Sequence, residues 1–187
     1  MKLVSHFDKI APKYRQLRQV DLPPIAYLSQ LLDNTTTQQG LELGCGTGRY
    51  SQLLLNYLPN LFLICCDYSN GMLDELKRKL QTRGKLRFDV LEKKAEELAF
   101  HKNTFDILFS FNAIHHLDMN KIIPHAEEWI SSGGWIFLYT RFPSQNRSSV
   151  WGRNFPKFVE RESRLYTEDQ LKVFSHNSCP PRTLRKH

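Results

Sequence analysis

The sequence predicts an α/β fold, a three-layer sandwich in which helices cover both faces of a mostly parallel sheet. Short apolar runs alternate along the chain with longer segments of helical periodicity, as in strands joined by crossover helices. One apolar run, residues 41–43, leads into a turn with three glycines, and another, residues 61–66, ends in Asp67. Both features fall at the carboxyl ends of predicted strands, where open parallel sheets bind ligands.

The length and composition fit a single domain, residues 1–187. A chain of 187 residues with 41% hydrophobic residues is long enough for a substantial core. No apolar run approaches the roughly 20 residues of a membrane-spanning helix, and the first residues lack the apolar stretch of a secretory signal. The cysteines show no disulfide or metal-site spacing, which predicts a reducing, cytoplasmic location.

Capping residues and apolar faces predict the helices of the first half. An amphipathic helix at 6–18 comes first, and Asp21 is expected to cap a second helix whose first turn holds two prolines. Leucines on one face predict a helix at 49–58, directly behind the glycine turn. Ser69 is expected to cap a helix at 70–82.

The second half continues the alternation of strands and helices. A helix predicted at 118–130 is expected to end at Gly133–Gly134, and the polar residues 144–149 predict a loop. Thr167 and Gln170 have the spacing of a capping box that opens a last helix. Strands are predicted at 85–90, 105–111 and 135–141.

The glycine-rich turn has the chemistry of a nucleoside-binding loop. Its glycines at 44, 46 and 48 let the backbone approach a ligand, and the helix behind them offers free N–H groups. Glu42, just before the loop, would repel a pyrophosphate but could accept a hydrogen bond from an ammonium group. Asp67 is placed to accept both hydroxyls of a ribose. A ligand with a ribose, an ammonium group and no pyrophosphate is S-adenosylmethionine.

Four stretches together resemble the class I S-adenosylmethionine-dependent methyltransferases, and most closely the small-molecule branch with the ubiquinone and menaquinone enzymes. They are Glu-Leu-Gly-Cys-Gly-Thr-Gly at 42–48, Asp67, the Phe-Asp strand at 105–110 and Ala-Ile-His-His-Leu at 113–117. The resemblance implies a Rossmann-like sheet of strand order 3-2-1-4-5. It also implies transfer of the sulfonium methyl group to a small-molecule acceptor, with S-adenosylhomocysteine as the product.

The resemblance divides the domain into three parts. Residues 1–33 correspond to a helical lid, in which Tyr14 could close the site or simply pack on its helix. Residues 34–141 correspond to the cofactor-binding core. Residues 142–187 form a basic, aromatic segment that hardly has room for the family's sixth and seventh strands. We therefore expect those two strands to be missing or incomplete.

The family's cofactor contacts carry over position by position. Met72 matches a residue that packs on the adenine, although core packing explains it equally well. Glu96 matches an acid that accepts from the adenine amino group, but Lys94 stands where the family usually has Asp. The predicted cofactor-binding residues are Glu42, Gly44, Cys45, Gly46, Gly48, Asp67, Tyr68, Met72, Glu96 and Asn112.

Three residues are candidates for a catalytic base: His115, His116 and Tyr14. In the family the two histidines' position lies near the methyl donor, so either could remove a proton from the acceptor. A histidine that is partnered by backbone at a helix start is the simpler explanation of each. No metal site is predicted, because no spaced carboxylates or cysteines accompany them.

Partners and alternative functions follow from the charge and from the short C-terminal part. Residues 141–187 hold ten Lys and Arg against four Asp and Glu, so they carry +6 of the net charge of +7. This excess suits an anionic acceptor, an RNA substrate or only a solvated surface. The missing strands suggest a second alternative, a non-catalytic protein that binds a cofactor or a partner. The open edge of the fifth strand calls for a cover, either residues 142–176 or a second copy in a homodimer.

Overall fold

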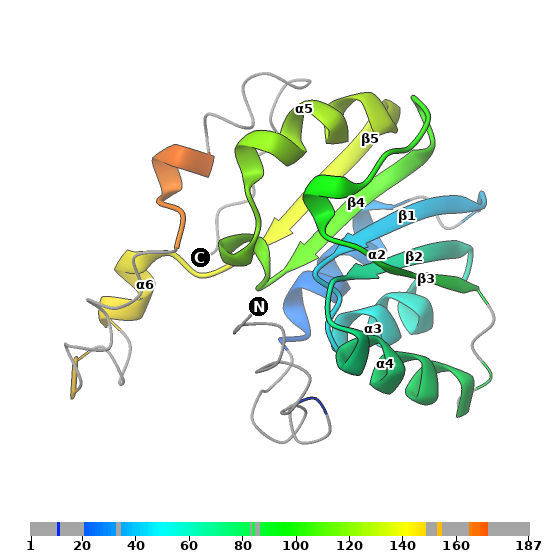
Figure 1. Cartoon of the computed structure of the whole chain (residues 1–187), viewed down its shortest axis with the longest axis horizontal. Helices are drawn as coiled ribbons and strands as arrows, with labels where there is room; N and C mark the ends of the chain where they lie inside the picture. The colour runs from blue at the N-terminus through cyan, green and yellow to red at the C-terminus, as the bar shows by residue number, and fades with distance from the viewer. Residues whose placement is uncertain are drawn as a thin grey trace.

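A five-stranded parallel sheet is the centre of the computed structural model, which describes residues 11, 21–32, 35–82, 84, 87–148, 153–154 and 165–171. The strand order is β3-β2-β1-β4-β5, which confirms the predicted order. Figure 1 shows the strands fanning across the molecule with their carboxyl ends at one edge. The strands are β1 (Gln38–Leu43), β2 (Leu61–Asp67), β3 (Phe88–Glu92), β4 (Phe105–Phe111) and β5 (Ile130–Tyr139).

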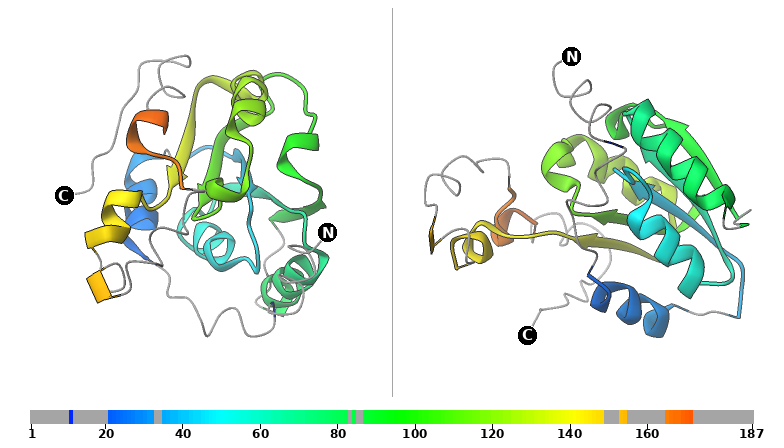
Figure 2. Two further views of the ribbon diagram at one scale, coloured as in Figure 1. Left: turned by 60° about the vertical axis from the view of Figure 1, so that its left-hand side comes forward. Right: turned by 90° about the horizontal axis from the view of Figure 1, so that it is seen from below.

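Helices cover both faces of the sheet, which confirms the three-layer arrangement (Figure 2). One core cluster lies between the sheet and α2 (Pro23–Leu31), α3 (Arg49–Tyr57) and α4 (Asn70–Thr82). A second cluster lies between the other face and α5 (Met119–Trp129), with the short helix η1 (Ala95–Glu97) beside it. Buried leucines and isoleucines repeat at helical spacing on the inner faces, as amphipathic helices require.

The position of β1 in the middle of the sheet determines where the site lies. It pairs with β2 on one side, Leu43 opposite Cys66, and with β4 on the other, Glu42 opposite Phe109. The glycine-rich loop that leaves β1 therefore lies between the carboxyl ends of its two neighbours. Asp67 ends β2, and the loop that begins at Asn112 leaves β4.

Two predicted strand positions were wrong by several residues. The third strand runs from Phe88 instead of residue 85, because the ladder with β2 begins by pairing Phe88 with Leu63. The fifth strand begins at Ile130, directly after α5, instead of at residue 135.

A wide bulge in β5 explains the second error. Phe105 of β4 faces Ile130, whereas Ile107, two residues on, faces Trp135, so the intervening residues of β5 bulge out. Gly133 has φ +82°, and a Cβ on Gly134 would lie 2.7 Å from the Asp106 carbonyl oxygen. The glycine pair therefore permits a bulge inside the strand.

Two other local predictions also failed. Asp21 does not cap α2, because the N-cap residue is Leu22, whose side chain is 53% exposed. The Asp21 carboxylate instead accepts a hydrogen bond from the Tyr139 hydroxyl at 2.7 Å, because β5 ends beside the start of α2. The predicted polar loop at 144–149 contains helix α6 (Pro143–Ser148), whose first residue is a proline suited to that position.

Residues 165–171 cover part of the second core cluster. The predicted capping box is present, with Thr167 N donating to Gln170 Oε1 and Gln170 N donating to Thr167 Oγ1. Tyr166 and Leu171 pack against the cluster that includes Ile136 and Leu138 of β5. In the parts of the chain that the structure describes, β5 pairs only with β4.

None of the described helices is both long enough and apolar enough to cross a membrane.

Candidate active site

The glycine-rich loop is held between β2 and β4. Its three glycines have φ values of +69°, +54° and +71°, which favour glycine over other residues. The amides of Gly44 and Cys45 donate to the Cys66 carbonyl oxygen, and a Cβ on Gly44 would lie 2.4 Å from the Cβ of Ala113. At Gly46, by contrast, no neighbouring atom of the described residues lies within 4 Å of the position of a Cβ. The loop is therefore packed at its start and open at its middle glycine.

Asp67 joins this loop to the turn that precedes α4. One carboxylate oxygen accepts from the amide of Gly46 at 2.9 Å, and the other accepts from the amide of Ser69 at 3.0 Å. Ser69 in turn caps α4, as predicted, with its hydroxyl accepting from the Met72 amide. These two hydrogen bonds fix the carboxylate at the end of β2.

Glu42 lies beneath the loop and is only 1% exposed. Ser51 Oγ, from the first turn of α3, donates to Glu42 Oε2 at 2.5 Å. Burial raises the pKa of the Glu42 carboxyl to about 8, the Ser51 hydrogen bond opposes that change, and the nearby charge of Asp67 adds to it. Near neutral pH the carboxyl is therefore protonated, and a positive group brought close to it would favour ionisation.

The other predicted cofactor residues on this side of the sheet are buried or half-buried. Met72 is buried in the first turn of α4, and Tyr68 is half-buried beside Asp67. Cys45 is buried as well, and that burial, together with its neighbour Cys65, raises the pKa of its thiol. A protonated thiol is a poor nucleophile, so Cys45 contributes packing and its backbone to the loop.

Glu96 makes a contact that the sequence did not predict. Its carboxylate accepts from the Asp118 amide at 2.7 Å and so satisfies one of the free N–H groups at the start of α5. One oxygen of the Glu96 carboxylate thus accepts a hydrogen bond from the protein's own backbone.

A network of hydroxyls surrounds Asn112 at the end of β4. Asn112 has φ +52°, and its side-chain amide donates to the Tyr50 hydroxyl at 3.5 Å. The same hydroxyl accepts from the Asp21 amide at 3.4 Å, and the Tyr139 hydroxyl donates to the Asp21 carboxylate. Burial raises the pKa of both phenols, with the Asp21 carboxylate adding to the effect at Tyr139. Both are therefore neutral donors or acceptors near pH 7.

Three residues of the site were not predicted from the sequence: Tyr50, Ser51 and Tyr139. Tyr50 and Ser51 sit on the buried face of α3 directly after the glycine loop. A polar group on that face was a signal that could have located them, since buried polar atoms require partners. Tyr139 offered no comparable signal, because its partner Asp21 is 118 positions away in sequence.

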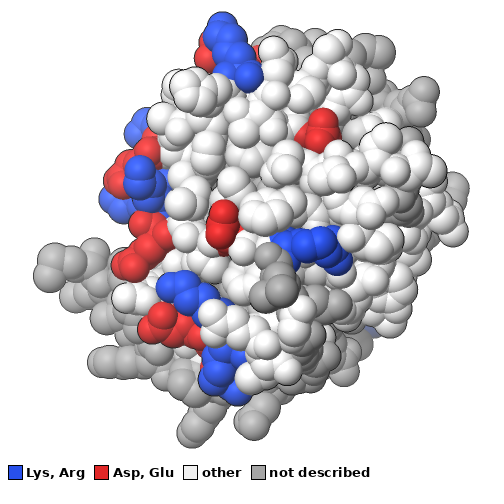
Figure 3. Space-filling view, turned by 90° about the vertical axis from the view of Figure 1, so that its right-hand side faces the viewer, with Lys and Arg blue, Asp and Glu red and all other residues white. Residues whose placement is uncertain are grey.

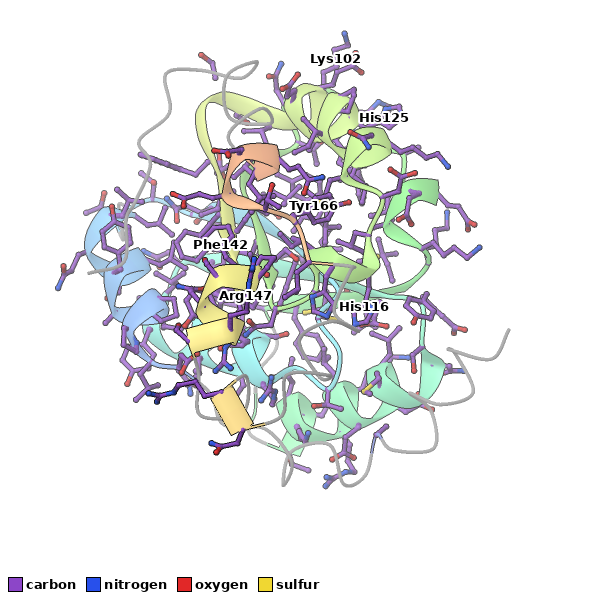
Figure 4. All side chains as sticks on the ribbon, turned by 90° about the vertical axis from the view of Figure 1, so that its left-hand side faces the viewer. Lys102, His116, His125, Phe142, Arg147 and Tyr166 are labelled. Carbon is purple, nitrogen blue, oxygen red and sulfur yellow. The ribbon has the colours of Figure 1, made fainter. Side chains whose placement is uncertain are left out.

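The two histidines lie on one short turn, η2 (Ile114–His116), after Asn112. Their rings are 4.1 Å apart, and both are half-buried. Figure 4 shows His116 near the carboxyl edge of the sheet, below Tyr166. The third candidate, Tyr14, lies outside the described residues.

Comparison with protein families identifies the chain. The family described as a methyltransferase domain matches residues 41–134, half of the chain, from the end of β1 into the bulge of β5. The chain belongs to the class I S-adenosylmethionine-dependent methyltransferases.

Curated relatives of this methyltransferase are longer proteins. It is 33% identical over 102 residues to malonyl-[acyl-carrier protein] O-methyltransferase 2 of Ilyobacter polytropus. The matched region covers 54% of this chain and 38% of that relative. It is 28% identical over 141 residues to the malonyl-[acyl-carrier protein] O-methyltransferase of Herminiimonas arsenicoxydans, covering 74% and 51%. The chain thus spans about half or less of the length of these relatives.

Solved structures of other methyltransferases share the fold. A SAM-dependent methyltransferase from Aquifex aeolicus matches with a TM-score of 0.69 at 14% identity, covering 89% of this chain and 86% of that one. Phosphoethanolamine N-methyltransferase 2 of Haemonchus contortus, in complex with S-adenosyl-L-methionine, matches with a TM-score of 0.66 at 21% identity, covering 82% and 35%.

The site of this methyltransferase has the groups that the family's cofactor needs. Gly46 leaves open space above the loop, where a side chain would otherwise project. Asp67 presents a fixed carboxylate beside that space, and Glu42 lies below it as a group that can become an anion. Amides at the start of α3 add a partial positive charge. These features fit S-adenosylmethionine.

Proposed function

We propose that this protein transfers the methyl group of S-adenosylmethionine to a small-molecule acceptor at the carboxyl edge of the sheet. The observation that carries the proposal is the loop fixed by Asp67 through Gly46 at the carboxyl ends of β1 and β2. Asp67 would hold the ribose and Glu42 would face the positive end of the cofactor. Met72 and Glu96 are proposed to border the adenine, with Glu96 keeping its hydrogen bond to Asp118.

Bound S-adenosylmethionine supplies a methyl group on a positively charged sulfur, which a nucleophile takes by in-line displacement as the carbon–sulfur bond breaks. The chain's own part is to orient the two reactants and to exclude water. Asn112 and the hydroxyls of Tyr50 and Tyr139 form a neutral polar wall for the acceptor. An acceptor that must lose a proton would transfer it to His115 or His116.

The acceptor that we propose is a carboxylate. The named activity of the relatives above is O-methylation of a malonyl group, which carries a free carboxylate. In this chain Arg141 is exposed just beyond the carboxyl end of β5. Its positive charge acts on Tyr139 and partly opposes the rise in the pKa of that phenol. A guanidinium group there could pair with an anionic acceptor. A carboxylate is already a nucleophile, so this reaction would need no base.

RNA is less well supported as the substrate. On the face that carries α4, Figure 3 shows basic side chains interspersed with acidic ones. Glu75 pairs there with both Arg78 and Lys79, and Lys77 lies 3.9 Å from Asp74. Among the described residues of this face, the basic side chains therefore do not form a continuous surface, which is the usual footprint of a nucleic-acid site.

The test is transfer of a labelled methyl group from S-adenosylmethionine to defined acceptors. Malonyl coenzyme A, a neutral acyl coenzyme A and bulk tRNA would be incubated separately with the protein. We expect label on the malonyl thioester, as a base-labile methyl ester, and none on the neutral thioester. Label on tRNA would replace the proposed acceptor with RNA. No label on any acceptor, with S-adenosylhomocysteine still binding, would favour the non-catalytic alternative.

Assembly and location are proposed separately. Among the described residues the outer edge of β5 is unpaired, and a second copy paired along it would give a homodimer, since an unpaired apolar strand edge favours association. Light scattering over a range of concentrations tests this, and a monomer throughout would exclude it. The cysteines Cys45, Cys65 and Cys66 are free of disulfide bonds, which supports a cytoplasmic location.

A further inference from the structure

The loop between β4 and α5 is held by side chains from two distant segments. It carries Asn112, both histidines and the start of α5. At its end, three neighbouring backbone groups have side-chain partners. The Asp118 amide donates to Glu96, the Leu117 carbonyl oxygen accepts from the Tyr166 hydroxyl at 2.8 Å, and the Met119 amide donates to that same hydroxyl at 3.2 Å.

The Tyr166 hydroxyl donates one of these hydrogen bonds and accepts the other. A phenol has one proton to donate and lone pairs that accept. Here the proton goes to Leu117 and a lone pair receives the N–H of Met119, so the hydroxyl bridges the last residue of the loop and the first residue of the helix. Moving either residue by a few tenths of an ångström would weaken one of the two hydrogen bonds.

The segment that carries Tyr166 is itself anchored. The reciprocal hydrogen bonds between Thr167 and Gln170 fix the turn that follows Tyr166. Its ring packs, together with Leu171, against the core cluster under α5. Figure 4 shows Tyr166 and His116 close to the same edge, although they come from segments about 50 residues apart.

We infer that Tyr166 is a positioning residue, which holds the loop of Asn112, His115 and His116 in the place where the methyl acceptor must meet the donor. The inference depends on the proposed function for the role of that loop. Through Tyr166, the segment at residues 165–171, which follows the sheet, would determine the position of this loop. The two hydrogen bonds of the Tyr166 hydroxyl described above are both to backbone, so this role differs from that of a residue that touches the reactants.

The test compares Tyr166→Phe with Tyr57→Phe. The first variant keeps the ring and its packing but removes both hydrogen bonds, and the second removes the hydroxyl of a half-exposed tyrosine at the end of α3. Three quantities are measured in each variant. They are the imidazole ¹H–¹³C resonances of His115 and His116 through a pH titration, the exchange rate of the Met119 amide, and kcat and KM with malonyl coenzyme A.

In Tyr166→Phe we expect both imidazole titration curves to change, the Met119 amide to exchange about tenfold faster, and kcat to fall about tenfold. The affinity for S-adenosylhomocysteine should stay within about twofold, because Asp67 and the glycine loop are untouched. Tyr57→Phe should change none of these. Unchanged imidazole titrations and unchanged Met119 exchange in Tyr166→Phe would overturn the inference. Because both readouts come from the free protein, this result is distinct from a wild-type protein that does not methylate the probe.

Discussion

At the scale of single residues, Glu42 is the group whose ionisation the fold alters most clearly among the carboxylates. Its folded-state pKa of about 8 exceeds the ordinary value of 4.5, so the folded protein keeps a proton that the unfolded chain has released. Stability therefore falls as the pH rises from about 4.5 to about 8, with a slope of up to about 1.4 kcal/mol per pH unit.

Glu42→Gln should remove this pH dependence. The amide is neutral at every pH, and its oxygen can still accept the hydrogen bond from Ser51. Urea unfolding at pH 5, 6, 7 and 8 measures the slope for both proteins. The control is Glu97→Gln, which alters an exposed carboxylate. Equal slopes in Glu42→Gln and the wild type would show that Glu42 is ionised throughout this range.

Asp67→Ala tests the second carboxylate. The variant loses the acceptor for Gly46 and Ser69 and, on our proposal, the acceptor for the ribose. Hydrogen bonds to a charged group contribute roughly 1.5–3 kcal/mol each, so the Kd for S-adenosylhomocysteine should rise at least about tenfold. Calorimetry measures it. Asp89→Ala, an exposed aspartate of β3, should bind normally, and unchanged affinity in Asp67→Ala would contradict the ribose contact.

At the scale of secondary-structure elements, the β5 bulge leaves no room for a side chain at residue 134. A Cβ at residue 134 would lie 2.6 Å from Ile130 Cγ2 and 2.7 Å from the Asp106 carbonyl oxygen, which is backbone and cannot easily move. Gly134→Ala should therefore lower the free energy of unfolding by about 1–3 kcal/mol. Ser132→Ala, an exposed change in the same bulge, should cost almost nothing. Equal stability of the two variants would contradict the crowding.

Local signals predicted most elements, and distant contacts explain the errors. The Ser69 cap and the Thr167–Gln170 box were confirmed because each depends on residues three positions apart. Asp21 looked equally suited to cap a helix, yet its carboxylate binds Tyr139, which only the folded chain brings near. The glycine pair of β5 was read as a helix stop because a bulge depends on register against β4.

The same division holds in the candidate site. The glycine loop and Asp67 were found from the sequence because strand ends and glycines mark them directly. Other contacts depend on how α3, η1 and residues 165–171 fold onto the sheet. They are the hydrogen bond from Ser51 to the buried Glu42, the hydrogen bond from the Asp118 amide to Glu96, and the hydrogen bond from Tyr166 to Leu117. No spacing in the sequence specifies those contacts.

At the scale of the whole molecule, the parallel sheet brings the chemistry together. The carboxyl ends of all five strands lie at one edge, and those of β1, β2, β4 and β5 contribute the glycine loop, Asp67, Asn112 and Arg141. A parallel sheet with a central first strand places these groups side by side, although they are spread over about half of the chain. The fold thus accounts for how the proposed cofactor site and the proposed acceptor site can share one edge.

The most direct test of this account is the melting temperature with S-adenosylhomocysteine and with NAD at equal concentration. A ligand at about 100 times its Kd stabilises the folded state by about 2.7 kcal/mol. For a chain of this size that corresponds to a rise of roughly 5–10 °C. We predict this rise with S-adenosylhomocysteine and no comparable change with NAD. A larger rise with NAD than with S-adenosylhomocysteine would contradict the account.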